Sequence, residues 1–202
     1  MRFEGYKLVF VAVGLIGILL IASPVLADFI HAPADEQFSE IYLLGPDNTA
    51  SNYPFNIEVG QNYLIYVGVG NHLSSSAYYV LYVKLQNQTD LLPNVAKKEP
   101  SPVQSLYEYR FFVQNGRTGE NPLSFSVSQA STKANQSLIK KISINHNLVE
   151  VNKIATWDSN STTYSYTLLV ELWVFNSQSN LIEYNDRFVS LRLNFTSNTV
   201  PT

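Results

Sequence analysis

The sequence predicts an all-β domain, an antiparallel β-sandwich of about 9–10 strands, that follows one apolar N-terminal segment. From residue 38 onward, short runs of β-branched, leucine and aromatic residues alternate with turn residues, a pattern typical of β-strands. The same part of the chain has no convincing apolar period of 3.6 residues, so helices are not expected there. Before it, residues 8–27 form an uncharged apolar run of about twenty residues, long enough to cross a bilayer as a helix.

The first 27 residues predict either a transmembrane helix or a signal peptide. Arg2 and Lys7 precede the apolar run and acidic residues follow it, a distribution that keeps the N-terminus in the cytoplasm and sends the rest outside. In a signal peptide, Pro24 would end the helix shortly before a small-residue cleavage site at Ala27. Both interpretations stay open. They predict a cell-membrane protein with a cytoplasmic N-terminus and an extracellular C-terminal domain, or a secreted protein if the chain is cleaved.

The chain divides into four predicted parts: an anchor or signal peptide at 1–27, a linker at 28–37, an extracytoplasmic β-domain at 38–196 and a loose tail at 197–202. The β-domain has an ordinary size for one domain and can bury a core without disulfide bonds. The chain contains no cysteine, which excludes disulfides, cysteine-ligated zinc and thiol catalysis.

Turn residues separate the first predicted strands, which cover residues 41–44, 55–59, 63–69 and 78–85. The first strand stops at a strong turn cluster, Gly45-Pro46-Asp47-Asn48. Gly68 and Gly70 indicate a bulge or a close backbone approach at the end of the third strand. A long connection at 87–102 follows, and loops of this length are either functional or mobile.

Further strands are predicted at 106–113, 123–127, 138–144, 148–154, 164–175, 181–184 and 188–195. The strand at 164–175 is the longest, since alternate residues from Tyr164 to Val174 are apolar or aromatic. Asp186 and Arg187 mark a turn or a bulge between the last two strands. Many short strands with turn signals between them favour an immunoglobulin-like sandwich, with a closed barrel as the alternative.

The amino-acid composition limits which partners are expected. Charged residues make up 14% of the chain and its net charge is −3. Without a basic patch to hold a phosphate backbone, nucleic acid is not expected as a partner. Four Asn-x-Ser/Thr sequons begin at Asn87, Asn135, Asn160 and Asn194. In a chain that faces outward, they predict N-linked glycans.

No motif points to catalysis. His31, His72 and His146 lie far apart, and none has a partner at the spacing that pairs metal ligands on one element. The sequence has no metalloprotease, nucleophile-elbow or phosphate-loop motif. It therefore predicts no catalytic residues, no cofactor and no metal site. Asp47 fits a turn better than a calcium site, and Glu171, inside the longest strand, is either a buried acid or an outward-facing or salt-bridged residue.

Aromatic residues offer a candidate recognition surface. The chain contains 13 tyrosines. Alternation predicts that Tyr78, Tyr82, Tyr107 and Tyr109 line one outer face of the sheet, and Trp157 falls in a loop-like stretch. Exposed aromatics of this kind would bind protein or sugar, whereas buried ones would belong to the core.

Five segments resemble a known family: F-S-E-I-Y-L-L-G-P-D from Phe38, Y-P-F-N-I-E-V-G-Q from Tyr53, Y-V-G-V-G-N-H from Tyr66, Y-Y-V-L-Y-V from Tyr78 and L-W-V-F-N from Leu172. They resemble the extracytoplasmic domain of an archaeal membrane-protein family catalogued as domain of unknown function 1616. The resemblance implies an envelope β-sandwich anchored by its N-terminus, and it implies no activity. The family usually has an acidic residue after the Asn-His step, where this chain has Leu73, so a site built on that acid is in doubt.

These features favour a membrane-anchored glycoprotein that acts as a structural or accessory interaction subunit of a cell-envelope complex, with protein partners in the envelope. Two alternatives stay open. A chain cleaved at Ala27 could be a secreted filament or surface-layer subunit that assembles by β-strand addition. The long connection at 87–102 could instead serve a glycan-binding protein or an enzyme.

Overall fold

The computed structural model describes residues 6, 12–13, 16 and 37–195. The chain separates into two units, Met1–Gln37 and Phe38–Thr202. Apart from residues 6, 12–13, 16 and 37, the predicted anchor or signal segment with its cleavage site at Ala27, the linker and the tail lie outside the described residues. Within the part that is described, no helix is long and apolar enough to span a membrane.

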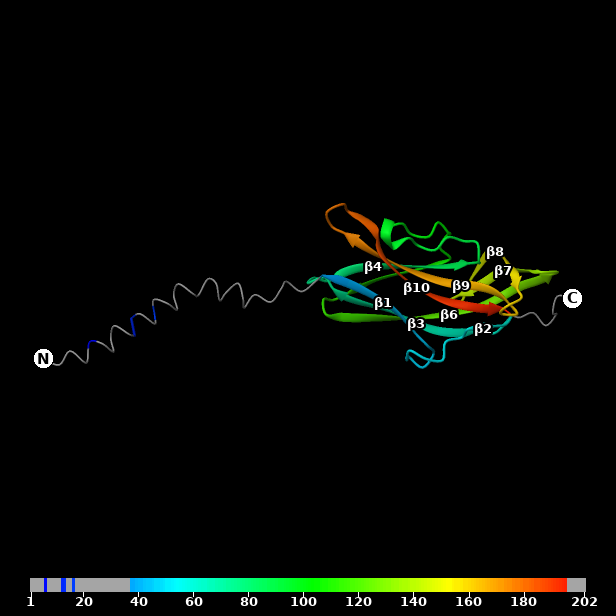
Figure 1. The fold of residues 1–202 in the computed structure, drawn as a ribbon, viewed down its shortest axis with the longest axis horizontal. Helices are drawn as coiled ribbons and strands as arrows, with labels where there is room; N and C mark the ends of the chain where they lie inside the picture. The colour runs from blue at the N-terminus through cyan, green and yellow to red at the C-terminus, as the bar shows by residue number, and fades with distance from the viewer. Residues whose placement is uncertain (1–5, 7–11, 14–15, 17–36, 196–202) are drawn as a thin grey trace. The chain divides into compact units, whose positions relative to one another are not determined.

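Residues 38–195, the described part of the second unit, form ten strands and one short 3₁₀ helix (Figure 1). In chain order these are β1 (Phe38–Leu44), β2 (Asn56–Ile57), β3 (Tyr63–His72), β4 (Ala77–Gln86), η1 (Val95–Lys97), β5 (Tyr107–Val113), β6 (Arg117–Lys133), β7 (Gln136–Ile144), β8 (Asn147–Asp158), β9 (Thr163–Asn176) and β10 (Leu181–Phe195). The prediction of an all-β domain is therefore confirmed.

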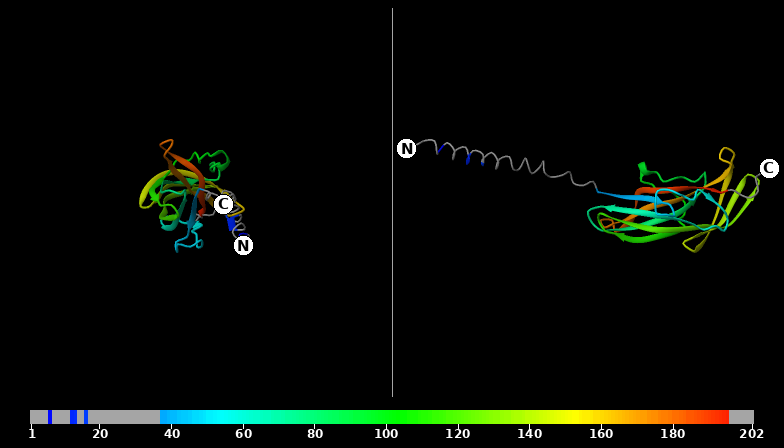
Figure 2. Two further views of the ribbon diagram at one scale, coloured as in Figure 1. Left: turned by 90° about the vertical axis from the view of Figure 1, so that its left-hand side faces the viewer. Right: turned by 90° about the horizontal axis from the view of Figure 1, so that it is seen from below.

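All ten strands belong to one sheet, which curls into a half-barrel (Figures 1 and 2). One strand group runs in the order β1-β3-β6-β7-β8, and the other runs β2-β10-β9-β4-β5. Two residue pairs between β8 and β9 join the groups, Trp157 with Tyr164 and Asp158 with Thr163. Every pairing between these strands is antiparallel except the short one between β2 and β10. This topology does not by itself establish two separate sheets, so the immunoglobulin-like sandwich is not confirmed.

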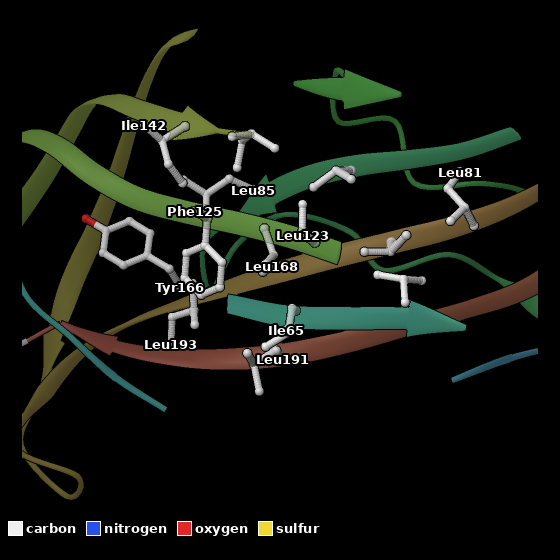
Figure 3. Packing of buried hydrophobic residues seen from close by; sticks show 14 of the residues in the cluster. Ile65, Leu81, Leu85, Leu123, Phe125, Ile142, Tyr166, Leu168, Leu191 and Leu193 are labelled. Carbon is white, nitrogen blue, oxygen red and sulfur yellow. The ribbon is translucent and has the colours of Figure 1, made fainter. Parts of the chain in front are cut away.

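Both strand groups contribute to one hydrophobic core, as expected from side chains that alternate between the two faces of a strand. Figure 3 shows Ile65 of β3 and Leu123 of β6 pointing toward Leu168 of β9 and Leu191 of β10. The largest fully buried side chains include three tyrosines and one phenylalanine: Tyr79, Tyr164, Tyr166 and Phe125. A core of this kind holds the two groups together without disulfides.

The predicted strands differ from the observed ones mainly at turn-like residues. The segments at 181–184 and 188–195 form one strand, β10, because a bulge between Tyr184 and Arg187 absorbs the extra residues. Asp186 adopts a positive φ of 56° in that bulge. The predicted strand at 55–59 shrinks to β2, and Trp157, expected in a loop, lies in β8.

β6 is far longer than the predicted 123–127, because its first half looks like a turn in sequence. Residues 117–122 contain Gly119 and Pro122, which usually interrupt strands. In the fold, β6 pairs with β3 from Arg117 to Phe125 and with β7 only from Phe125 onward. The first half of β6 therefore has one unpaired edge, where proline is tolerated.

Candidate interaction surface

A covering loop, residues 87–106, lies over the outer face of β4 and β9. Val80 and Leu169 are fully buried, although neither belongs to the hydrophobic core between the strand groups. Their side chains are therefore on the other face of the sheet. The polar side chains Lys84 and Gln86 of β4 are buried there too, and both donate hydrogen bonds to Ser101 of the loop. The sequence predicts a functional or mobile connection at 87–102. It does not predict that this connection covers the outer face of the sheet.

A buried ion pair fastens the covering loop to the sheet. Lys84 Nζ lies 2.8 Å from Glu171 Oε2, and their side chains are 6% and 0% exposed. Lys84 Nζ also donates to the Ser101 carbonyl at 2.7 Å, and the Ser101 amide donates to Glu171 Oε1 at 2.7 Å. Trp173 Nε1 donates to Glu171 Oε2 at 3.2 Å. With these donors around it, the Glu171 carboxylate attaches the covering loop to the sheet.

The same environment affects Tyr184 of β10. Burial raises the pKa of the Tyr184 hydroxyl to about 12, and the carboxylates of Glu171 and Asp186 add to that effect. The Tyr184 ring packs against Trp173 with ring centroids 5.7 Å apart. The tyrosine therefore stays neutral and serves as packing at neutral pH.

An aromatic patch lies on the same outer face, next to the area under the loop. We define it as Tyr78, Phe112, Trp173 and Phe175. Tyr78 and Phe112 are cross-strand partners in β4 and β5, with ring centroids 4.7 Å apart. Phe112 is 75% exposed and Phe175 is 39% exposed. Large apolar side chains gathered in this way favour contact with another macromolecule.

Only half of the predicted tyrosine face is correct. Tyr78 lies on the outer face with Phe112, and Tyr82 packs edge-on against Trp173. Tyr107 and Tyr109 instead pack against the hydrophobic core. The register explains the error: Tyr78 pairs with Phe112 and Tyr82 with Glu108, so the odd-numbered residues of β5 face inward.

A seam separates β1 from β10. Among the described residues, β1 pairs only with β3, and β10 pairs with β9 and, over its last two residues, with β2. Two hollows of about 260 and 360 Å³ lie along the seam. The smaller hollow has a mixed polar and apolar lining: Glu40, Ile41, Val95, Asp186, Arg187 and Phe188. The larger hollow has a mostly apolar lining: Leu43, Tyr53, Phe55, Val189, Ser190 and Leu191.

The Gly-Val-Gly-Asn-His segment of β3 allows β1 to pack closely against β3. Glu40 and Tyr42 of β1 lie flat across Gly70 and Gly68, where any Cβ would fall within about 2.5 Å of their side chains. His72 Nε2 lies 2.8 Å from Glu40 Oε1, and its ring stacks on Phe38. These contacts fit close packing of β1 against β3.

Asn71, in the same segment, is fully buried and ties two turns together. Its side-chain amide donates to the carbonyls of Ser75 and Val113, both at 2.8 Å, and its Oδ1 accepts from the Leu73 amide at 3.0 Å. Leu73, found where the resembling family has an acidic residue, packs against the core. These hydrogen bonds hold the turn between β3 and β4 against the end of β5.

The four sequons occupy different environments. Asn135 and Asn160 are exposed, in the turns between β6 and β7 and between β8 and β9. Asn87 Nδ2 donates to the Ile154 carbonyl at 2.6 Å, while its Oδ1 accepts from Thr89 and Asp90. Asn194 lies in β10 between β9 and β2, and its Nδ2 donates to Asn56 Oδ1 at 3.3 Å. Asn135 and Asn160 are thus the more exposed pair, whereas the side-chain amides of Asn87 and Asn194 are half-buried and hydrogen-bonded.

The other candidate ligands are dispersed. Asp47 Oδ2 accepts from Asn52 Nδ2 at 3.0 Å within the turn after β1, as a turn residue does. His146 lies in the turn between β7 and β8, and His31 lies outside the described residues. In the part of the chain that the structure covers, no three His, Asp or Glu side chains gather where they could hold a metal ion.

Sequence reasoning missed the covering loop and the partner of Glu171. One signal was present: Lys84 and Glu171 are opposite charges, each inside a long apolar strand. Two such charges are expected to pair if both are buried. Their pairing depends on β4 lying beside β9, where Tyr82 is opposite Glu171 and Lys84 is opposite Leu169. That adjacency is a property of the topology, which alternation within one strand does not contain.

Solved structures share the β-rich architecture only distantly. A β-glucosidase from Listeria innocua in complex with glucose matches 82% of this chain at 11% identity and a TM-score of 0.42, and this chain spans only 17% of that enzyme. The CARDB domain of a Pyrococcus furiosus protein, in complex with di-metal ions, matches at 6% identity and a TM-score of 0.40, covering 82% of this chain and 94% of that domain. Likenesses this weak carry no argument about activity or ligands.

Sequence comparison gives a firmer result. Among curated proteins, none matches this chain. A family model described as Domain of unknown function (DUF1616) matches residues 32–139, more than half of the chain and including β1 to β6. The matched range contains the Leu-Gly-Pro-Asp turn, the Gly-Val-Gly-Asn-His segment of β3 and most of the covering loop's contacts with β4. The chain therefore belongs to the DUF1616 family.

Proposed function

We propose that this protein is a non-catalytic, membrane-anchored glycoprotein whose extracytoplasmic β-domain is an accessory interaction subunit of a cell-envelope complex. The observation that carries the proposal is the aromatic patch, with Phe112 75% and Phe175 39% exposed. Aromatic residues are enriched where protein interfaces bury their centre, and isolated soluble domains rarely leave several of them together in water.

The location follows from the sequence. The apolar run at 8–27, with Arg2 and Lys7 before it, supports an anchor that leaves the β-domain outside the cytoplasm. The absence of cysteine means that the domain depends on its core alone for stability in an oxidising exterior. An archaeal envelope is the setting that the family resemblance suggests.

We also propose that the fold is an immunoglobulin-like sandwich. Support comes from the way the start of the chain divides between the two strand groups: β1 pairs with β3, and β2 pairs in parallel with β10. The five-strand groups share one core, as the two sheets of such a sandwich do. A module of this kind presents its outer faces and edge strands to partners.

A second candidate function is assembly by strand addition after cleavage at Ala27. The seam favours it, since β1 and most of β10 each have a partner on one side only among the described residues. An extended segment from a neighbouring subunit could pair there and place side chains in the two hollows. This candidate requires a secreted chain, whereas the leading one requires a retained anchor.

Site-specific photo-crosslinking in the native membrane tests the leading proposal. A crosslinking amino acid in place of Phe175 should give an adduct with a different envelope protein. The matched control is Leu148 of β8, an exposed apolar residue (60%) on the other strand group, which should give none. No adduct at Phe175, or a protein that always runs alone as a monomer after detergent extraction, would contradict an accessory role.

Mass spectrometry of the intact native protein, with N-terminal sequencing, separates the two candidates. A chain that retains residues 1–27 supports the anchored subunit. A chain that begins at Asp28 excludes the anchor and supports the secreted assembly subunit.

A further inference from the structure

β5 (Tyr107–Val113) is an open edge of the sheet. Among the described residues it pairs only with β4, so one side of the strand has no β-partner. The side chains along β5 alternate between exposed Glu108, Arg110 and Phe112 and the half-buried rings between them. An open edge next to exposed apolar surface is a template for pairing with another strand.

Hydrogen bonds show which backbone groups are available at this edge. The Leu106 amide donates to the Val83 carbonyl of β4 at 2.7 Å, which shows that the backbone groups of Val83 point toward β5. Val83 is the register partner of Tyr107, so Tyr107, Tyr109 and Phe111 direct their backbone groups toward β4. Glu108, Arg110 and Phe112 therefore direct theirs away from β4, toward the open edge.

The strand sequence is complementary to itself about Tyr109. If a second copy of β5 pairs in antiparallel orientation with Tyr109 opposite Tyr109, Glu108 of each copy lies opposite Arg110 of the other. Tyr107 then lies opposite Phe111. Every cross-strand pair is charge-matched or aromatic, and such pairs are the favourable ones in antiparallel sheets.

We propose that two copies of this chain associate through β5, antiparallel and with the two-fold axis at Tyr109. The proposal goes beyond the accessory function proposed above, since it concerns a second copy and a sheet edge. It joins the second strand groups of two molecules into one continuous sheet. It also places the second copy beside Phe112 of the aromatic patch, and Phe175 on β9 remains for a different envelope protein.

Charged residues on an edge strand usually oppose pairing. Whether two copies of β5 can pair therefore depends on the order of the charges along the strand. Within one chain, Arg110 Nε donates to Glu108 Oε1 at 2.9 Å. In the proposed register each carboxylate also faces the partner's guanidinium, giving a cluster of two positive and two negative charges. A register shifted to centre on Arg110 would place the two arginines opposite each other, which is destabilising. Charge therefore selects the register about Tyr109.

Charge reversal on the full-length protein in detergent tests the proposal. The wild type should be dimeric by light scattering. Arg110→Glu and Glu108→Arg chains should each weaken self-association by about tenfold, because like charges then face each other. The double variant E108R/R110E should dimerise again, and a mixture of the two single variants should form heterodimers. A monomeric wild type, or an R110E chain that dimerises like the wild type, would overturn the proposal.

Cysteine crosslinking tests the register by a second method, which does not depend on charge reversal. The chain has no native cysteine, so introduced thiols have no competitors. Residues 108 and 110 of opposite copies would form a hydrogen-bonded pair, with Cα atoms about 5.5 Å apart, within the range of a disulfide. A mixture of Glu108→Cys and Arg110→Cys chains should crosslink under mild oxidation, and each chain alone should not. Crosslinking of the Arg110→Cys chain with itself would show a different register, and circular dichroism checks that each variant is folded.

Discussion

At the scale of single residues, the buried ion pair under the covering loop makes each of its members dependent on the other. Glu171 accepts hydrogen bonds from the Ser101 amide and from Trp173, and it pairs with Lys84. Removing one charge leaves the other buried without its counterion, which typically costs 3–5 kcal/mol, whereas neutralising both can cost little. The pair therefore matters less for net stability than for keeping the loop in this one position.

We expect Lys84→Met to lower the free energy of unfolding by about 3–5 kcal/mol. The double variant K84M/E171Q should recover part of that loss, because glutamine still accepts from the Ser101 amide and needs no counterion. Urea unfolding monitored by tryptophan fluorescence measures both values. Lys98→Met, at a lysine whose side chain is 79% exposed, is the matched control and should change stability by less than about 1 kcal/mol. A double variant less stable than K84M would contradict this account.

Glycan occupancy is a second prediction at this scale. We expect glycans at Asn135 and Asn160, whose side chains are exposed in turns, and none at Asn87 or Asn194. The Asn87 and Asn194 side-chain amides donate to the Ile154 carbonyl and to Asn56, so a glycan there would displace packed strands. Glycopeptide mass spectrometry of the native protein measures occupancy at each site. Full occupancy at Asn194 would mean that modification precedes formation of the β2–β10 pair.

At the scale of elements, the turn after β1 depends on one glycine. A Cβ on Gly45 would lie 1.9 Å from the Ser51 carbonyl oxygen, which is backbone and cannot rotate away. The same turn is held by the Gly45 amide, which donates to the Thr49 carbonyl at 2.7 Å, and by the Tyr53 hydroxyl, which donates to the Leu43 carbonyl at 2.8 Å. The Leu-Gly-Pro-Asp motif is thus a packing requirement.

We expect Gly45→Ala to destabilise the domain by roughly 2–3 kcal/mol, because the Ser51 backbone must move. Gly119→Ala is the control, since the nearest atoms to its Cβ are side-chain carbons at 3.3 Å or more, and it should cost less than 1 kcal/mol, about the effect of an ordinary surface change. Chemical denaturation of both variants measures the difference. Equal losses would show that the turn can rearrange.

Also at this scale, alternation within one strand was sufficient to locate most strands, because inward and outward residues differ in polarity. It was insufficient at the bulge in β10 and in the first half of β6, where Asp186 and Pro122 are tolerated only because of the pairing around them. The direction of Tyr107 and Tyr109 could not be predicted for the same reason. The register between β4 and β5 fixes it, and that register involves contacts between segments about thirty residues apart, a separation that no pattern within one strand records.

At the scale of the whole molecule, several tyrosines resist ionisation because the fold buries them. Burial raises the pKa of Tyr109 and Tyr166 to about 12, and it also raises the pKa of Tyr79. The pKa of a tyrosine in the unfolded chain is about 10. Because the folded pKa is the higher one, the stabilisation is complete below about pH 10 and is lost as the pH rises toward 12. One pKa unit corresponds to about 1.4 kcal/mol, so fully buried Tyr166 alone accounts for roughly 2–3 kcal/mol.

We therefore expect the domain to unfold cooperatively between about pH 10 and 12, with tyrosinate absorbance appearing together with the loss of β-structure by circular dichroism. Tyr166→Phe removes one of these titrations and should make the loss of stability with pH less steep, although it also removes the hydrogen bond to the Ser137 carbonyl at 2.8 Å. The slope of unfolding free energy against pH is therefore the decisive quantity, and stability at neutral pH is not. Tyrosinate absorbance that reaches its full value near pH 10 while the β-structure persists would show that these rings are open to water.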